Sequence, residues 1–364
     1  MRPTAIPASL MRGGTSKGLF FLAENLPADR ATRDAVLLAA MGSPDVREID
    51  GVGGAHPLTS KVAVVRRSAR ADADVDYLFL QVWPDRPEVS DQQNCGNMLA
   101  AVGPFALEEG LVGASYGRTP VRIFMENTQS LAVATVETPG GVVTYDGDAR
   151  IDGVPGSHAP VPIEFLDVAG STCGALLPTG NPVDVIEGLR VTCIDNGMPV
   201  VCVNARDLGV RGDEDPATLE ADDDLVARVE ALRLAAGRAM NLGDVTTQTV
   251  PKMSLLSPGR HGGRLSTRTF IPHRVHEAIG VFGAVSVATA CLVSGSVAHD
   301  IAGGSLHAGA HEVIVEHPSG YFTVTLDVVG EGPSMTFERV ALLRTARLLM
   351  RGDVMVPGRV WEHG

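Results

Sequence analysis

The sequence contains few aromatic residues and few positive charges. Aromatic side chains make up 4% of its 364 residues, and the formal net charge is −13. Proteins that bind single-stranded nucleic acid usually stack bases on aromatic side chains, and duplex binders normally present a basic face. The composition therefore argues against a nucleic-acid partner. An acidic protein that binds an anionic substrate must concentrate its positive charge in the binding pocket.

Long apolar segments are also missing. No run approaches the roughly 20 residues that a membrane-spanning helix requires. The start, from Met1 to Pro7, lacks the apolar core of a signal peptide. We therefore expect no membrane partner and a cytoplasmic location. The sequence leaves the oligomeric state open, including a homo-oligomer.

Cysteine is sparse and follows no recognisable spacing. The five cysteines are odd in number and include no Cys-x-x-Cys pair: Cys95, Cys173, Cys193, Cys202 and Cys291. This pattern favours reduced thiols and argues against a structural zinc site. The histidine pairs His273/His276 and His307/His311 lack the adjacent glutamate of a zinc-protease helix, so we expect no metal. A Gly-x-Ser-x-Gly elbow is also missing, which disfavours a serine hydrolase.

Length and patterning predict a strand-rich chain with enough residues for two domains. The expected helices are 29–41, 98–107, 222–240, 284–293 and 341–350. The expected strands are 4–11, 19–22, 62–65, 75–82, 191–194 and 200–203, with hairpins over 121–136 and 313–329. In the helix 222–240 the apolar residues form one stripe, and the acidic start suits the positive end of the helix dipole.

Each half of the chain contains one almost entirely apolar helix that follows a glycine turn. The first begins at Cys95-Gly96-Asn97 and the second at Phe282-Gly283-Ala284. This repetition predicts two similar α/β domains that face each other across a cleft. The alternative is that two glycine-rich turns resemble each other by chance.

The segment Asn94-Cys95-Gly96-Asn97 is the most distinctive local motif. A thiol at a helix N-terminus feels the helix dipole and the N–H groups of the first turn, which favour the thiolate. The same N–H groups can bind a substrate carboxylate, and Gly96 allows a ligand to approach closely. For an isolated cysteine, a small buried side chain is the commoner role. Here the polar flanks and the glycine favour a function.

Lys61 follows the glycine-rich segment from Asp50 to Gly54 and begins an apolar strand. Partial desolvation at that position favours the neutral amine and makes it a usable base. A surface lysine at a strand end is the ordinary alternative. The glycines do not form a dinucleotide-binding fingerprint, because the Gly-x-Gly-x-x-Gly spacing is missing. We therefore expect no nucleotide cofactor.

Two further segments could bind anions. The stretch from Arg12 to Gly18 contains two cations, two hydroxyls and three glycines, which suits a carboxylate bound by backbone N–H groups, Thr15 and Ser16. An ordinary polar hairpin is the alternative. The segment from Arg260 to His276 is the most basic part of the chain, and it could line an anion pocket or form a solvated loop.

Taken together, these motifs resemble the methylaconitate isomerase family, often called PrpF proteins. The ordered set is Met11 to Gly18, Gly53-Gly54 with Ser60-Lys61-Val62-Ala63, Asn94-Cys95-Gly96-Asn97, Asp195-Asn196-Gly197-Met198-Pro199 and Val250-Pro251-Lys252. The resemblance spans nearly the whole chain. It implies an α/β (α+β) fold of two pseudo-symmetric, diaminopimelate-epimerase-like domains, residues 1–184 and 185–364. Each would be a mixed sheet wrapped around a central helix, with the active site between them and the last helix packed back on the first domain.

Within the family, the sequence is similar above all to the 4-oxalomesaconate tautomerases of gallate breakdown, a branch of aromatic catabolism. The resemblance implies a cofactor-independent isomerase that interconverts the keto and enol forms of an unsaturated tricarboxylic acid. Lys61 would transfer the proton, and Cys95 would be its partner near the opposite side. The residues implied to hold the substrate are Arg12, Gly14, Thr15, Ser16, Ser60, Gly96, Asn97, Met98, Asn196, Met198 and Lys252.

The chain departs from the epimerase pattern at the second helix. Epimerases of this fold use one cysteine at each helix N-terminus, but Val281-Phe282-Gly283-Ala284 has none, and Cys291 lies too far inside. The resemblance therefore implies a lysine-assisted proton shift in place of two-thiol racemisation. One alternative is cis–trans or allylic isomerisation of an aconitate-like tricarboxylate. Another is a homologue that binds carboxylates without catalysis, against which Lys61 and Cys95 argue.

Overall fold

The computed structural model describes residues 2–91, 95–166, 168–304, 307–330 and 336–362, and the chain forms two compact units. Unit 1 contains Met1–Glu164 and Leu343–Gly364, and unit 2 contains Phe165–Leu342. The segment 165–184, which we expected in the first domain, thus belongs to unit 2. The reason is its bonding to the strand that ends at Asp195. The Asp195 carboxylate accepts hydrogen bonds from the N–H groups of Thr172 and Cys173 at 2.8 and 2.7 Å.

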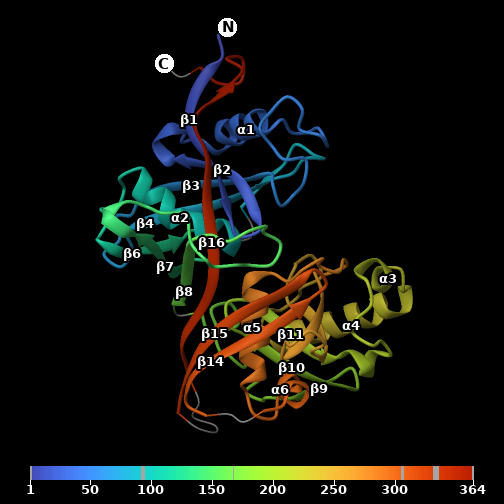
Figure 1. Ribbon diagram of the computed structural model, residues 1–364. Coiled ribbons are helices and arrows are strands. Elements are labelled where there is room, and N and C mark those ends of the chain that lie inside the picture. Colours follow the sequence, from blue (N-terminus) through green and yellow to red (C-terminus); the bar gives the residue numbers. More distant parts are fainter. Residues whose placement is uncertain (1, 92–94, 167, 305–306, 331–335, 363–364) are drawn as a thin grey trace. The chain divides into compact units, whose positions relative to one another are not determined.

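Unit 1 is a mixed sheet with helices packed against it (Figure 1). Its strands are β1 (Thr4–Gly13), β2 (Ser16–Leu22), β3 (Lys61–Arg67), β4 (Val75–Val82), β5 (Val89–Ser90), β6 (Gly117–Met125), β7 (Ser130–Thr138) and β8 (Pro160–Leu166). Its helices are α1 (Arg30–Met41) and α2 (Gly96–Glu108), with short 3-10 turns at Ala23–Asn25 and Pro139–Gly141. The strand order is β1-β2-β3-β4-β6-β7-β8. The short strand β5 pairs with the end of β4, at Gln81 and Val82, whereas β6 pairs with its beginning.

Helix α1 begins and ends where the sequence predicts. The Asp29 carboxylate accepts a hydrogen bond from the Thr32 N–H at 2.9 Å, which caps the first turn. Gly42 ends the helix in the left-handed region, with φ of 86°. The buried face of α1, which includes Leu37, belongs to one apolar cluster with strands β1 to β4.

Both faces of the unit 1 sheet are covered, which explains the apolar run in β2. Leu19 and Phe21 belong to the cluster under α1. Phe20 lies on the other face, with its ring centre 5.5 Å from that of Phe105 on α2. Since successive strand residues point to opposite faces, a sheet covered on both sides requires apolar residues at every position.

Unit 2 has the same architecture. Its strands are β9 (Asp184–Ile186), β10 (Leu189–Asp195), β11 (Pro199–Asn204), β12 (Lys252–Pro258), β13 (Leu265–Phe270), β14 (Gly309–His317), β15 (Gly320–Val329) and the beginning of β16 (Thr336–Val356). Its helices are α3 (Pro216–Glu220), α4 (Asp223–Ala239), α5 (Val281–Cys291) and α6 (Val297–Ala302), with a 3-10 turn at Ala205–Leu208. The predicted stripe of α4 packs into one cluster with β10, β11 and β12. All residues of α5 are buried.

Strand pairing confirms the predicted duplication. In unit 1, β1–β2 are antiparallel, β2–β3 parallel, β3–β4 antiparallel, β4–β6 parallel and β6–β7 antiparallel. Unit 2 repeats this sequence of pairings in β10–β11, β11–β12, β12–β13, β13–β14 and β14–β15. The crossovers also correspond, because α1 and α4 precede the third strand of each set, and α2 and α5 precede the fifth.

One predicted helix is wrong. The segment 341–350 is part of strand β16, whose first half pairs with β15 and whose second half pairs with β1. Its apolar residues are spaced at intervals that also fit a helix. Pairing with β15, the preceding strand, and with β1, at the other end of the sequence, decides in favour of the extended conformation.

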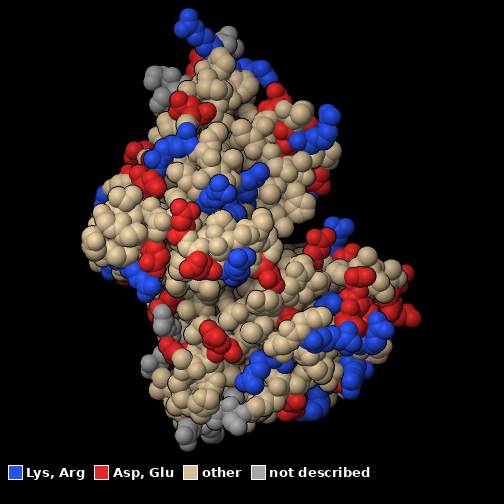
Figure 2. Space-filling view, in the orientation of Figure 1, with Lys and Arg blue, Asp and Glu red and all other residues tan. Residues whose placement is uncertain are grey.

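No helix within the described ranges has the length and hydrophobicity to cross a membrane. The face shown in Figure 2 carries interspersed acidic and basic side chains rather than one broad basic area. Many of the cations form ion pairs at the surface, such as Arg70 with Asp72 and Arg122 with Asp74, both at 2.8 Å.

Candidate active site

Helix α2 begins beside the tight turn between β1 and β2. Cys95 is the residue that precedes the helix, and its side chain does not cap the first turn. The Ser16 hydroxyl lies 4.0 Å from the Cys95 sulfur. Gly14 has φ of 51°, and a Cβ at this position would overlap the Asn97 side chain. The turn therefore needs glycine for its left-handed backbone and for its contact with α2. Asn94, the first residue of the predicted motif, lies outside the described residues.

The first turn of α2 offers N–H groups to an anion. In an α-helix the first N–H groups have no partner within the helix, and the dipole makes this end positive. The turn comprises Gly96, Asn97 and Met98. The Asn97 amide donates to the Thr15 hydroxyl at 3.1 Å, while Asn97 Oδ1 is buried and accepts no hydrogen bond in the part of the chain that is described. This arrangement can hold a carboxylate group.

The Arg12 guanidinium bonds to the same turn. Its Nη1 donates to the Gly14 carbonyl at 2.9 Å, and to the carbonyl and hydroxyl of Thr345 at 3.1 and 3.0 Å. Burial, with a smaller contribution from Arg347, lowers the pKa of Arg12 below its ordinary value. Among the described residues, Arg12 Nη2 has no hydrogen-bond partner although it is buried. A buried guanidinium N–H without an acceptor is well suited to an incoming carboxylate.

Lys61 is the first residue of β3 and is only 6% exposed. Its Nζ donates to Gln81 Oε1 at 2.8 Å and lies 5.0 Å from the centre of the Phe79 ring. Gly18 pairs with Lys61 across β2 and β3, and a Cβ on Gly18 would overlap both the Lys61 carbonyl and the Met98 side chain. The start of β3 therefore lies next to the first turn of α2.

Ser60, immediately before Lys61, is bonded to a buried carboxylate. Its hydroxyl donates to Glu48 Oε2 and accepts from the Gly54 N–H at 3.3 Å. The Ala55 N–H donates to the same Glu48 oxygen at 2.7 Å. Glu48, which is 2% exposed, thus ties the glycine segment to the start of β3. Sequence reasoning missed Glu48, because an acidic residue in an irregular segment carries no pattern that separates a buried carboxylate from a solvated one.

In unit 2 the corresponding turn lies between β10 and β11 and is bonded to α5. The Asn196 N–H donates to the Ser286 hydroxyl at 3.1 Å, and its side-chain amide donates to the Thr289 hydroxyl at 2.8 Å. The Met198 carbonyl accepts from the Ser286 hydroxyl at 2.7 Å. The predicted residues Asn196 and Met198 are therefore held against α5, as the Gly14 turn is held against α2.

Lys252 occupies the position in β12 that Lys61 occupies in β3, the first residue of the strand. Burial, and to a smaller extent the neighbouring Arg233, lowers the pKa of Lys252 to about 8. Its ammonium group forms no hydrogen bond or ion pair with any residue whose position is described. Lys252 can therefore bind an anion or exchange a proton near neutral pH.

A family profile described as PrpF protein matches residues 4–357. The chain belongs to the PrpF family. It is 61% identical over 351 residues to a protein of Novosphingobium sp. strain KA1 named (4E)-oxalomesaconate Δ-isomerase, which covers 96% of this chain and 97% of that one. It is 59% identical over 361 residues to a protein of Pseudomonas putida named 4-oxalomesaconate tautomerase, with 99% of each chain covered.

Solved structures agree with this assignment to the PrpF family. The crystal structure of a methylitaconate Δ-isomerase matches with a TM-score of 0.85 and 33% identity, and all of both chains is covered. A hydroxyproline epimerase from Agrobacterium vitis matches with a TM-score of 0.54 and 14% identity, over 98% of this chain and 94% of that one. The second likeness shows the fold alone. The predicted family and the epimerase-like fold are both confirmed.

The cysteines of this PrpF chain differ in burial. Cys95 is half-buried, and the other four are buried. Burial raises the pKa of Cys173, Cys193 and Cys291 to about 12, and it also raises that of Cys202 well above its ordinary value. Cys291 is the last residue of α5 and lies about 15 Å along the helix from its first residue, Val281. The first turn of α5, all of which is described, therefore has no thiol.

The histidine pairs form local contacts. His311 Nε2 lies 2.7 Å from the His307 carbonyl, and His273 Nδ1 lies 3.9 Å from a carboxylate oxygen of Glu230. Within the described ranges, no three His, Cys, Asp or Glu side chains are grouped so that they could hold a metal ion.

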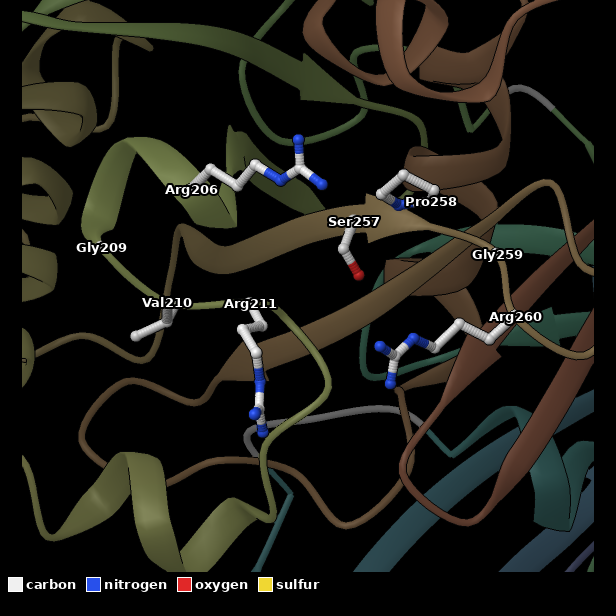
Figure 3. A pocket seen from close by; sticks show the side chains of 8 residues that line it. All are labelled: Arg206, Gly209, Val210, Arg211, Ser257, Pro258, Gly259 and Arg260. Atoms are coloured by element: carbon white, nitrogen blue, oxygen red, sulfur yellow. The ribbon is translucent and has the colours of Figure 1, made fainter.

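A pocket of about 480 Å³ lies in unit 2 at the end of β12 opposite to Lys252 (Figure 3). It is lined by Arg206, Gly209, Val210, Arg211, Ser257, Pro258, Gly259 and Arg260. In Figure 3 the Arg260 side chain extends toward Ser257. Asp213 pairs with Arg260 and, at 2.9 Å, with Arg211, which neutralises much of the positive charge. Ser257 is the fifth residue after Lys252 along the strand, a distance of about 17 Å, so the pocket is distinct from the Lys252 position.

Proposed function

We propose that this chain is a cofactor-independent isomerase that interconverts the keto and enol forms of 4-oxalomesaconate, with Lys61 as the proton-transferring base. The observation that carries the proposal is the buried Lys61 amine, which is bonded to a neutral amide and lies next to the first turn of α2. The substrate is supported by the two relatives named for 4-oxalomesaconate, which are 61% and 59% identical.

Keto–enol conversion needs a base and a group that stabilises negative charge on oxygen. The neutral Lys61 amine removes a proton from the carbon next to the substrate carbonyl. The C–H electron pair forms the C=C bond, and the carbonyl π electrons move to oxygen. The positive end of the α2 dipole stabilises this enolate. The Cys95 thiol then protonates the enolate oxygen, after which solvent returns a proton to the thiolate and removes the one on Lys61.

The substrate carboxylates require several donors. Arg12 contributes Nη2, which is buried and has no acceptor among the described residues. Gly96, Asn97 and Met98 contribute N–H groups, and the hydroxyls of Thr15 and Ser16 lie on the adjoining turn. In unit 2, Lys252 has the chemistry to bind a carboxylate, because its ammonium group is half-buried and carries no counter-ion in the described chain.

A second candidate is the allylic shift of a double bond in a related acid. The solved structure that is 33% identical is named for methylitaconate Δ-isomerase. The same base would serve, because an allylic C–H next to a carboxyl-bearing alkene is also a carbon acid. Only the position to which the proton returns would differ.

The two candidates can be separated by proton exchange in deuterated buffer. Purified protein is mixed with 4-oxalomesaconate, with methylitaconate or with an aconitate-type acid, and exchange and product formation are followed by proton NMR. We expect turnover of 4-oxalomesaconate to exceed that of the other acids. Lys61→Ala should reduce the rate about 10²–10⁴-fold, the usual contribution of a general base.

Arg118→Ala is the matched control, since it removes one positive charge from an exposed strand position that pairs with Glu137. Its rate should equal that of the wild type. Turnover of methylitaconate alone would favour the second candidate. If the wild-type protein exchanged none of these acids faster than buffer, the proposal would fail.

A further inference from the structure

Gln81 is a buried polar residue in the otherwise apolar centre of the unit 1 sheet. It lies in β4 directly opposite Lys61 in β3, and it is 2% exposed. The side chains of these two residues meet, with 2.8 Å between Lys61 Nζ and Gln81 Oε1. A buried amide is costly unless its donors and acceptor are all used, so the network around it determines what the residue does.

The backbone fixes which end of the amide faces Lys61. Gln81 Nε2 is surrounded by three carbonyl oxygens, those of Pro57 at 3.0 Å, Ser60 at 3.1 Å and Val82 at 3.1 Å. An NH₂ group can only donate, and a carbonyl oxygen can only accept. If the amide were rotated by 180°, its oxygen would face three carbonyl oxygens and its NH₂ would face the ammonium group. The oxygen is therefore held toward Lys61 by the chain itself.

This acceptor carries no charge. Among the described residues, no carboxylate lies within ion-pair distance of Lys61 Nζ. A carboxylate within about 4–6 Å would strongly favour the protonated amine. An amide oxygen accepts a hydrogen bond from the ammonium and equally from the neutral amine, which keeps two N–H donors. Lys61 can thus lose and regain its proton without losing its position.

Other titratable and aromatic groups lie around the start of β3. Glu48 bonds to Ser60, and Cys95 lies at the start of α2 near Ser16. The Tyr77 hydroxyl lies 3.5 Å from the Cys95 carbonyl. The centre of the Phe79 ring lies 5.0 Å from Lys61 Nζ. Of these groups, Gln81 is the one whose side chain bonds to Lys61 Nζ.

Unit 2 provides an internal comparison. Lys252 begins β12 as Lys61 begins β3, but the β12–β13 pairs end at Met253 and Phe270, and the next residue after Phe270 is Ile271. Isoleucine cannot accept a hydrogen bond, and the Lys252 amine has no partner in the described chain. The two units thus share the lysine but not the amide, which suggests that the amide serves a task specific to Lys61.

We propose that Gln81 is the positioning residue of Lys61: its neutral amide oxygen fixes the amine for proton transfer and leaves it free to change protonation state. This inference rests on the proposed role of Lys61 as the base. Lysine side chains carry large rotamer entropy, and fixing one in advance lowers the cost of reaching the reactive geometry. Gln81 touches no substrate in this scheme and acts only through Lys61.

The test uses Gln81→Glu, which keeps the shape and adds a negative charge, and Gln81→Met, which removes the acceptor. Gln129→Glu adds the same charge at an exposed turn and is the control. The sequence contains only three lysines, Lys17, Lys61 and Lys252, so ¹³C-lysine labelling gives three ε-carbon signals that can be titrated one by one. Lys17→Arg and Lys252→Arg assign the signals.

In Gln81→Glu we expect the titration midpoint of the Lys61 signal to rise by one pH unit or more. The pH profile of kcat should move by the same amount, so that kcat at neutral pH falls about tenfold per unit, while KM changes less than about twofold. In Gln81→Met, kcat should fall at least tenfold without a rise in the midpoint. Gln129→Glu should match the wild type in all three measurements.

Three results would overturn the inference, and they can be told apart. If Lys61→Ala retained wild-type activity, the proposed function and this inference would both fail. If Lys61→Ala were inactive but Gln81→Glu left the Lys61 midpoint unchanged, this inference alone would fail. Should Gln81→Glu not fold, judged by circular dichroism, Gln81→Met decides: an unchanged kcat in that variant rejects a positioning role.

Discussion

Arg233 on α4 is a fully buried arginine, and its removal gives the sharpest test of how unit 2 holds the segment before Lys252. Its Nη1 donates to three carbonyl oxygens, those of Val245, Gln248 and Val250, at 3.1, 3.2 and 3.0 Å. Its Nε and Nη2 donate to the two carboxylate oxygens of Glu230 at 2.7 and 2.8 Å. The side chain thus closes the loop between α4 and β12.

The cost of Arg233→Met follows from these contacts. Breaking a buried ion pair by removing one partner typically costs about 3–5 kcal/mol. Each buried carbonyl left without a donor would add about 1–3 kcal/mol if it stayed dry. Glu230 is partly exposed and Gln248 is exposed, so water can replace some of the lost bonds. We therefore expect the free energy of unfolding of unit 2 to fall by about 3–5 kcal/mol. For a unit of this size, each kcal/mol corresponds to roughly 2–4 °C in Tm.

Urea and thermal unfolding followed by circular dichroism would measure this loss. Arg238→Met is the matched control, because it makes the same substitution at an exposed position of the same helix and should cost less than about 1 kcal/mol. Hydrogen exchange of residues 245–252 should speed up in Arg233→Met only. If Arg233→Met cost no more than Arg238→Met, the reasoning from buried hydrogen bonds would be wrong.

Three further predictions concern the site. Because the pKa of Lys252 is lowered to about 8, its positive charge is present below that pH and is lost above it. If Lys252 binds a substrate carboxylate, KM should rise as the pH passes 8, and Lys252→Arg should abolish the rise, which initial rates from pH 6 to 10 would show. Iodoacetamide at pH 8 should alkylate Cys95 alone in the native protein and all five cysteines in urea, as counted by mass spectrometry; a second alkylated native thiol would contradict the burial of the others. Gly14→Ala should raise KM at least tenfold with little change in the far-ultraviolet circular dichroism spectrum, because its Cβ would displace the Asn97 side chain. An unchanged KM would show that this turn does not bind the substrate.

Local patterns in the sequence predicted most of the elements. Helix α1 is delimited by Asp29 and Gly42, whose side-chain and backbone chemistry acts within one turn. The stripe of α4 likewise follows from its own periodicity. The ordered motifs around Lys61, Cys95 and Lys252 identified the family, because they depend on residue types and spacing alone. The limits of α1 and the stripe of α4 arise from interactions between residues close in sequence.

Tertiary structure alone decided the rest. Segment 341–350 has apolar spacing that fits a helix, yet it forms a strand because it pairs with β15 and β1. Gln81 can bond to Lys61 only because β3 and β4 place the two residues opposite each other. Arg233 is satisfied in the core only because its guanidinium meets three carbonyls of the loop before β12. Such contacts join residues 12 to more than 300 positions apart, and their energies come from burial and hydrogen bonds that exist only after folding. The sequence by itself determined the chemical groups and the family, whereas the fold determined which groups meet and which of them are buried.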